Sequence, residues 1–268
     1  MVVGPVRFRH AGAVTSREFR KHRSDAPRDF FAAEAAGLRW LADAGAAVPE
    51  VLDVGVDHIT LRRLTTAAPT RRHAQEFGAV LARVHGCGAD RFGSPPDGFT
   101  GQLFIGNRPM PSIPTARWGE FYARQRVLAF VDDAVAAGNL DRADETATRE
   151  ACELIASGGF DDGQPPARIH GDLWNGNVMW TPEGVVLIDP AAHGGHRETD
   201  LAMLALFGCP ALDVIIAGYE EVYPLVDGWP ERIAVHQLHP LAVHAVGHGP
   251  GYGVELGRAA RQTLALAR

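Results

Sequence analysis

The sequence predicts an α+β fold of two lobes, in which a small β-rich N-terminal lobe with one main helix precedes a larger, mostly helical C-terminal lobe. A length of 268 residues is enough to bury a full core, either in one large domain or in two lobes. Strand-like runs come first, with a turn at Gly12, and they are Val6–His10, Arg17–Lys21, Val51–Gly55 and Ile59–Leu64. Helical spacing dominates afterwards, so we expect the lobes to span residues 1–64 and 65–268.

The composition is typical of a soluble protein that does not bind nucleic acid or membranes. Hydrophobic residues make up 46% and charged residues 22% of the chain, as in an ordinary soluble protein. The formal net charge of -6 argues against a nucleic-acid partner, because phosphate backbones require a basic surface. No apolar run is long enough to span a membrane, and charges interrupt residues 1–10 where a signal peptide would be apolar. Three widely spaced cysteines fit a reducing compartment, so we expect a cytoplasmic protein without a membrane partner.

The main helix of the N-terminal lobe is expected to begin near Ser24–Pro27, which carry helix-start chemistry, and to end near Gly45. Its buried stripe consists of apolar residues at helical spacing, namely Phe31, Leu38 and Leu41. Glu34 falls on the same stripe. A buried carboxylate is costly unless it is paired, so Glu34 requires a partner.

Lys21, at the end of a predicted strand, is the candidate partner of Glu34. A strand-borne lysine that points into a cleft can bind the α- and β-phosphates of a nucleotide, and a helix glutamate can hold that lysine by a charge-assisted hydrogen bond. A surface lysine and a half-exposed glutamate fit the spacing equally well. The spacing alone leaves both interpretations open.

The C-terminal lobe begins with a helix whose stripe is Phe77, Leu81 and Val84. The Gly- and Pro-rich stretch that follows is predicted to be an ordered insert or a long connection. The expected insert is 86–114, and the further helices are expected at 118–137, at 142–157 and through most of the chain after residue 198.

The stretch Arg168–Asp200 carries the strongest chemical signal. A His-Gly-Asp turn ends at Asp172, Asn177 follows five residues later, and a hydrophobic strand ends at Asp189. Transfer of a γ-phosphoryl group needs a carboxylate beside the acceptor hydroxyl and two oxygen ligands on Mg²⁺. We therefore expect Asp172 to act on the acceptor and Asn177 and Asp189 to bind Mg²⁺.

A hairpin would bring these residues together. Thr181–Gly184 is typical of a four-residue turn, and if Trp180 faces Val185 across it, Asn177 and Asp189 lie at the same open end. Trp174 would give the loop a flat apolar wall. A buried aspartate cap beside an ordinary hairpin is the alternative for any one of these residues, but it requires three coincidences for the set.

Other segments are less specific. The chain lacks GxxxxGK[ST], which excludes a P-loop enzyme. His193 and Arg197 lie where an activation segment would sit beside the substrate, and Arg197 is predicted either to pair with phosphate or to brace Asp200. The histidines near the C-terminus are spaced on one helix, but no cysteine or carboxylate accompanies them in that run, so zinc binding is disfavoured. We expect Pro240 to interrupt that run.

The motifs HGDLWNGN and LIDPAAHGGHRETDLAM closely resemble the fructosamine kinase (ketosamine-3-kinase) family, within the aminoglycoside-phosphotransferase-like and choline-kinase-like kinases. Further similar stretches are FFAAEAAGLRWL, VPEVLDVG, FGAVLARVH, WGEFYARQRV and GWPERIAVHQLHPLAVHAVGHGPGYG. Together they cover nearly the whole chain after Glu18. The resemblance implies a bilobal, protein-kinase-like fold with ATP in the cleft.

The resemblance also implies residue roles. Asp172 is similar to the catalytic base, Asn177 and Asp189 to the Mg²⁺ ligands, and Lys21 with Glu34 to the ATP-orienting ion pair. The hinge that reads adenine through its backbone resembles Leu61, Arg62, Arg63 and Leu64. Asp200 resembles the acid that braces the catalytic loop, which His170 also supports. His244 resembles a cleft-facing residue, and we expect it on the substrate side with Trp174, His193 and Arg197.

The implied activity is ATP-dependent phosphorylation of the sugar 3-hydroxyl in fructosamines, ribulosamines or similar ketoamines, free or bound to protein, as a step in deglycation. Two other functions stay open. One is another kinase of the same fold, acting on aminoglycosides, choline or a sugar, and the other is a pseudokinase that binds ligands without catalysis. We expect a monomer or a weak homodimer.

Overall fold

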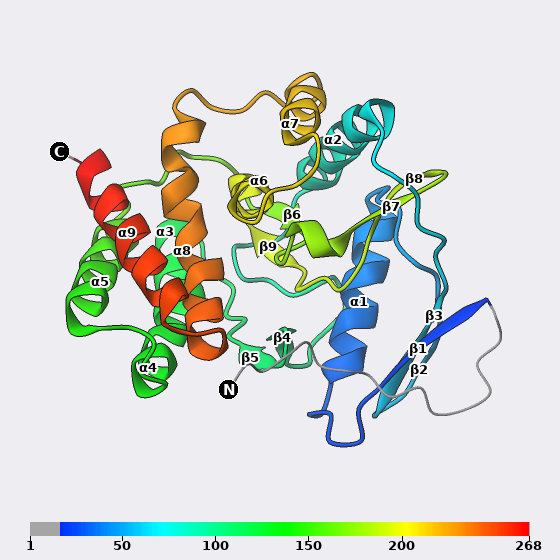
Figure 1. Ribbon diagram of the computed structural model, residues 1–268, viewed down its shortest axis with the longest axis horizontal. Coiled ribbons are helices and arrows are strands. Elements are labelled where there is room, and N and C mark those ends of the chain that lie inside the picture. Colours follow the sequence, from blue (N-terminus) through cyan, green and yellow to red (C-terminus); the bar gives the residue numbers. More distant parts are fainter. Residues whose placement is uncertain (1–16, 268) are drawn as a thin grey trace.

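The computed structural model describes residues 17–267, so the strand predicted at Val6–His10 and the turn at Gly12 lie outside the described part of the chain. The described residues form the expected α+β structure, with small sheets and many helices. Figure 1 shows the three-stranded sheet and α1 at one end and the helices α4, α5, α8 and α9 at the other. Short strands and α6 lie between them.

The N-terminal sheet contains three antiparallel strands in the order β1-β3-β2. Their bounds are Glu18–His22 for β1, Val51–Val54 for β2 and His58–Arg62 for β3. Helix α1 (Phe30–Asp43) packs on this sheet and buries Phe31, Leu38, Ile59 and Leu61. The apolar stripe is thus as predicted, and the three predicted strands that fall within the described residues lie within two residues of their expected bounds.

The boundaries of α1 differ from the prediction at one end. The helix starts at Phe30 instead of near Ser24–Pro27, and its first cap, Asp29, has a left-handed φ of 68° and makes no side-chain cap hydrogen bond. At the other end Ala44 caps the helix and Gly45 follows with φ 92°, a conformation that favours glycine. The predicted stop is confirmed.

The C-terminal part begins with α2 (Arg71–Gly86), which packs along α7 (Leu212–Glu220). The insert that follows contains a short hairpin of β4 (Leu103–Ile105) and β5 (Arg108–Met110), which was not predicted. This hairpin contacts α1. It therefore connects the insert to the N-terminal helix.

The helices α3, α4, α5, α8 and α9 pack against one another at the far end, whereas α6 lies nearer the centre (Figure 1). A π-helical turn, Tyr122–Val127, joins α3 (Trp118–Phe121) to α4 (Leu128–Ala136) without a break. The remaining helices are α5 (Arg142–Ala156), α6 (Arg197–Leu206), α8 (Trp229–Gly247) and α9 (Pro250–Leu266). The expected interruption at Pro240 is wrong, because α8 continues through this residue.

Two small ribbons carry the motif region. Strand β6 (Ala167–Ile169) pairs with β9 (His193–Gly195), and β7 (Val178–Thr181) pairs with β8 (Gly184–Leu187). Trp180 faces Val185 across the second ribbon, as the predicted turn requires. The lobe boundary after residue 64 stays a prediction. In the described part of the chain, no helix combines the length and apolarity needed to cross a membrane.

Candidate active site

A cavity of about 260 Å³ lies where the N-terminal sheet and α1 meet the motif region. Its lining comes from four parts of the chain, namely β1, α1, the β4–β5 hairpin and the loops of the Arg168–Asp200 stretch. The predicted residues among the lining are Lys21, Glu34, Asp172, Trp174, Asn177 and Asp189. The side chains expected to perform phosphoryl transfer therefore converge on one cavity.

Lys21 lies at the centre of an ion-pair cluster. Its Nζ donates to Glu34 Oε1 at 2.6 Å and also contacts Asp189 Oδ1. Lys21 is buried, and burial opposes its charge, but the carboxylates of Glu34 and Asp189 outweigh this effect and raise the pKa of Lys21 above its usual value. The lysine is therefore protonated at neutral pH, and it is held between Glu34 on α1 and Asp189 in the motif region.

Asp172 lies in the loop after β6, held by its neighbour Asn177. The amide Nδ2 of Asn177 donates to Asp172 O at 2.7 Å and to Asp172 Oδ2 at 3.1 Å. Burial and the charge of Asp189 raise the pKa of Asp172 to about 7, although the hydrogen bond from Asn177 opposes this shift. A carboxylate with a pKa near neutrality is suited to accept a proton.

The oxygen atoms around the cavity fit a magnesium ion. Asn177 Nδ2 donates to Asp172, whereas no described residue donates a hydrogen bond to the amide oxygen of Asn177, which is therefore available as a ligand. Asp189 contributes a carboxylate whose side chain is 44% exposed, and its left-handed φ of 54° is uncommon among residues other than glycine. Carboxylate and amide oxygens are hard donors, and Mg²⁺ in kinases takes few protein ligands and completes its shell with phosphate and water.

Asp200 braces the loop that carries Asp172. It is fully buried at the start of α6, and it accepts hydrogen bonds from the backbone N–H groups of His170 at 2.7 Å and Gly171 at 3.0 Å. His85 Nε2 lies 3.2 Å from the same carboxylate. The ring of His170 in turn donates from Nε2 to Ile188 O at 2.9 Å. Asp200 and His170 therefore tie the two loops of the site together.

The predicted hinge begins in β3, the central strand of the N-terminal sheet, and lies outside the lining of the cavity. Leu61 is 3% exposed and packs in the core under α1, whereas Arg62 and Arg63 point outward. Arg62 pairs with Glu50, and Arg63 Nε donates to Glu18 O. Contact of the Leu61–Leu64 backbone with adenine stays a prediction.

Aromatic side chains extend from the cavity toward α8. Trp174 is 40% exposed, and its ring lies 6.1 Å from that of Phe207. The Phe207 ring in turn lies 4.9 Å from His244, which is 5.0 Å from Tyr252. His244 is thus placed on the Trp174 side of the site, although it does not line the cavity itself.

Two residues expected to meet substrate are enclosed instead. Arg197 is 2% exposed, donates to Tyr223 O and Pro224 O at 3.0 and 2.7 Å, and stacks 3.9 Å over the Tyr223 ring. Arg197 does not line the cavity, and in the described part of the chain no hydrogen bond or ion pair joins it to Asp200, so neither predicted role is supported. His193 is also 2% exposed and lies among buried groups outside the cavity lining. Its predicted contact with substrate is not supported.

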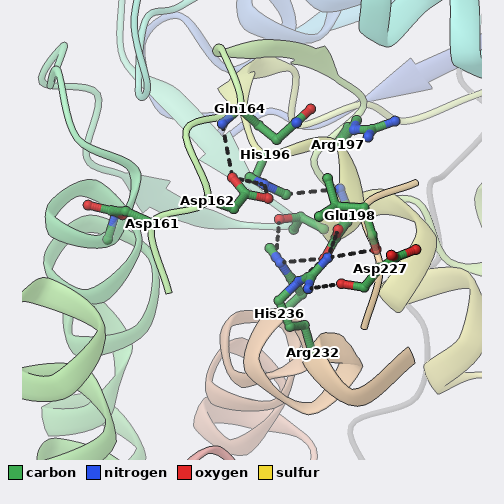
Figure 2. A network of polar contacts seen from close by, with 12 residues as sticks. Asp161, Asp162, Gln164, His196, Arg197, Glu198, Asp227, Arg232 and His236 are labelled. Carbon is green, nitrogen blue, oxygen red and sulfur yellow. Dashed lines mark hydrogen bonds and ion pairs between the residues drawn. The ribbon is translucent and has the colours of Figure 1, made fainter. Parts of the chain in front are cut away.

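A buried polar network lies at the start of α6 (Figure 2). Glu198 accepts from Arg232 at 2.6 and 3.0 Å, and His236 and His196 lie beside it. The ligand atoms of His196, Glu198 and His236 fall within 4.8 Å of one another, which raises the question of a metal. However, His196 Nδ1 accepts the backbone N–H of Glu198, so in the neutral ring Nε2 carries the proton that faces Asp162. The contacts fit a hydrogen-bonded network, not a metal site.

Sequence reasoning missed one wall of the cavity. Leu103, Phe104, Gly106 and Asn107 of the β4–β5 hairpin all line it. Asn107 Oδ1 accepts from the Arg23 guanidinium at 3.1 Å, and Phe104 packs edge-on against Phe30 at 5.2 Å. The apolar Leu-Phe-Ile run before Gly106 was the available signal, but it is too short to distinguish a strand from a loop.

Comparison with known proteins identifies the group to which the chain belongs. A family model described as fructosamine kinase matches residues 8–266. A relative from Thermus thermophilus, described as a probable ketoamine kinase, is 32% identical over 267 residues, covering 96% of this chain and 93% of the relative. Escherichia coli K12 YniA, described in the same words, is 33% identical over 222 residues, covering 79% of this chain and 72% of YniA.

Solved structures agree with these relatives. A candidate fructosamine-3-kinase from Thermobifida fusca superposes with a TM-score of 0.85 at 44% identity, covering 92% of this chain and 85% of the other. The aminoglycoside phosphotransferase APH(4)-Ia, solved with AMP-PNP and hygromycin B, has a TM-score of 0.61 at 18% identity, covering 95% and 88%. At this identity the second likeness indicates the protein-kinase-like fold alone. The chain belongs to the fructosamine kinase family, and it is a phosphotransferase with an alcohol group as acceptor.

Proposed function

We propose that this protein uses Mg²⁺ and ATP to phosphorylate the sugar 3-hydroxyl of fructosamine- or ribulosamine-type ketoamines, as a step in deglycation. The observation that carries the proposal is the convergence of Lys21, Glu34, Asp172, Asn177 and Asp189 on one cavity. Two relatives described as probable ketoamine kinases match this chain over most of their length, and they support the choice of acceptor. A pseudokinase would have no need to keep all five side chains together.

In this proposal the sugar hydroxyl binds beside Asp172. The carboxylate accepts or orients the hydroxyl proton while the oxygen attacks the γ-phosphorus. The new O–P bond forms as the bond from the γ-phosphorus to the β,γ-bridging oxygen breaks, and ADP leaves with that electron pair. No phosphorylated enzyme is required.

The other residues position the nucleotide. Lys21, held by Glu34, would bind the α- and β-phosphates, and Asn177 and Asp189 would hold the metal. When bound, Mg²⁺ neutralises charge on the transferring phosphoryl group. Most of the rate enhancement then comes from orientation and electrostatic stabilisation.

Trp174 supports an acceptor site on the open side of the cavity, because its partly exposed ring offers an apolar face next to Asp172. The Phe207 and His244 rings extend this surface toward α8. A hexose or pentose ring with a short amine substituent suits such a surface.

An ADP-release assay with fructosyl-lysine and ribulosyl-lysine tests the proposal directly. Phosphorylation of either ketoamine at the 3-hydroxyl, located by NMR of the product, is the expected result. Aminoglycosides, choline and free sugars serve as comparison acceptors. A higher kcat/KM for any of these would contradict the proposed acceptor class, and Mg-ATP binding without ADP release on any of them would indicate a pseudokinase.

A further inference from the structure

The guanidinium of Arg126 is enclosed in the C-terminal part, and no carboxylate of residues 17–267 pairs with it. Arg126 lies on the π-helical turn, is 1% exposed and stacks 4.5 Å over the Phe121 ring. Its Nη1 donates to Pro111 O at 2.7 Å and to Gln125 O at 2.9 Å, but its buried Nη2 has no hydrogen-bond partner in the described part of the chain. Burial lowers the pKa of Arg126 to about 9. Such a cation is costly to bury.

The remaining nitrogen of this side chain fixes the state of His193. Arg126 Nε donates to His193 Nε2 at 3.1 Å, and because arginine only donates, this ring nitrogen must be the acceptor. The proton of the neutral ring is then on Nδ1, which donates to Ala191 O at 2.7 Å. Burial and the charge of Arg126 hold the pKa of His193 well below its usual value. The ring is therefore neutral, in one tautomer.

The carbonyl of Ala191 lies between the two loops of the active site. Ala191 follows Asp189 by two residues and lines the same cavity. Its carbonyl packs directly on Gly171, where a Cβ would collide with it, and Gly171 has the φ of 79° that favours glycine. Gly171 precedes Asp172. The Ala191 carbonyl thus contacts the loop that carries the proposed base, whereas Ala191 itself belongs to the loop that carries the proposed metal ligand.

We propose that Arg126 is a positioning residue, which acts through His193 and the carbonyl of Ala191 to hold the Asp189–Ala191 segment against the catalytic loop. The proposal rests on the proposed role of Asp189 as a metal ligand. Asp189 has a left-handed φ of 54°, so its segment needs neighbours that hold it in place. An apolar side chain would fill the position of Arg126 without burying a charge. A π-helical turn and an unpaired buried cation are both locally unfavourable, and such features occur frequently at functional sites.

The test follows Mg²⁺-dependent binding of ADP by calorimetry, so that no acceptor is needed. Arg126→Met and His193→Leu remove the two ends of the relay, and Tyr122→Phe is the control. Tyr122 is equally buried on the same π-helical turn and bonds to the backbone of α8 instead of His193. We expect each single variant to raise the Mg²⁺ concentration for half-maximal ADP binding by roughly tenfold or more, as loss of an outer partner of a metal ligand does. The double variant should add nothing further, and Tyr122→Phe should bind as the wild type does.

Additive effects of the two substitutions, or unchanged Mg²⁺ dependence in both, would overturn the relay even if the variants were less stable. If Arg126→Met does not fold, Arg126→Lys replaces it, and ¹⁵N NMR of the wild-type protein gives an independent readout. The expected signal for His193 is the neutral Nδ1–H tautomer, and an Nε2–H or doubly protonated ring would refute the proposal. Asp189→Ala separates the two claims, because normal Mg²⁺-dependent ADP binding in that variant would remove the metal-ligand assignment itself.

Discussion

Lys21 donates to Glu34 at 2.6 Å, although the two residues lie 13 positions apart, one on β1 and the other on α1. The same ammonium contacts Asp189, which is far away in the sequence and belongs to the motif region. The pair is therefore the point at which the N-terminal sheet, its helix and the proposed metal loop meet. Its contacts explain why a glutamate is kept on the apolar stripe of α1.

We expect Lys21→Met and Glu34→Ala each to raise the KM for Mg-ATP by roughly tenfold or more, in line with about 1.5–3 kcal/mol for a hydrogen bond between charged groups. Because Glu34 acts by holding Lys21, the double variant should be little worse than either single variant. Steady-state kinetics at saturating acceptor measures both effects. Glu76→Ala, which removes the exposed pair with Arg72, is the control. Additive losses would show that Glu34 does not act through Lys21.

Asp200→Ala should be strongly destabilising. The substitution leaves the N–H groups of His170 and Gly171 without their acceptor and removes the charged partner of the buried His85, which keeps only its bond to Tyr219. We expect a loss of roughly 3–5 kcal/mol in the free energy of unfolding. Urea denaturation measures it, with the exposed Asp213→Asn as the control. A loss below about 1 kcal/mol would contradict the bracing role.

The pH dependence of Asp200 has a definite sign. Burial opposes ionisation, but the hydrogen bond and charge of His85 outweigh it and lower the pKa of Asp200 below its usual value. A lowered pKa contributes stability that is present above the unfolded-state pKa and is lost as pH falls through the folded-state value. The wild type should therefore lose this contribution in acid, whereas Asp200→Asn should have a weaker dependence in the same range.

Asp172 should have the opposite effect on stability. Its pKa is raised to about 7, first by burial and then by the charge of Asp189, so the folded protein binds its proton more tightly than the unfolded chain does. The stability of the wild type should then fall between about pH 4 and pH 7 and level off above that. Asp172→Asn removes this slope. Denaturation curves at several pH values, without Mg²⁺, would contradict the assignment if the two proteins gave parallel profiles.

Arg197→Met should lower the stability of the fold without changing the binding of the acceptor. The guanidinium bonds to the carbonyls of Tyr223 and Pro224, so its loss should cost roughly 2–3 kcal/mol of stability. The KM for the ketoamine should change by less than about twofold, because Arg197 faces no part of the cavity. A large rise in the acceptor KM with unchanged stability would restore the substrate role that its position in the sequence suggests.

Local patterns predicted the parts of the fold that depend on neighbours in the chain. The turn at Thr181–Gly184 and the hydrophobic run that follows it define the β7–β8 ribbon, and this ribbon brings Asn177 and Asp189 to one cavity. Glycine ended α1 for the same local reason. The hairpin of β4 and β5 escaped prediction because its strands have three residues each and one contains Pro109.

Contacts between distant segments were the main source of error. His193 and Arg197 lie in a glycine-rich stretch where an activation segment would sit beside the substrate, yet both side chains are buried. His193 packs against Arg126 and Phe121. Arg197 bonds to the carbonyls of Tyr223 and Pro224. Arg126 meets His193 across 67 positions, and no spacing rule connects them. The sequence therefore predicted the lining groups on the motif, and the resemblance also pointed to Asp200 and His170 as supports of its loop. The contact of Arg126 with His193 required the three-dimensional structure.

The most direct test of the account is the turnover of Asp172→Asn with a ketoamine acceptor. The variant should fold and bind Mg-ADP as the wild type does, because Lys21, Asn177 and Asp189 remain. Its kcat for phosphorylation of fructosyl-lysine or ribulosyl-lysine should fall by roughly 10² to 10⁴, the range typical of a lost general base. A folded variant that turns over at nearly the wild-type rate would contradict the central role given to Asp172.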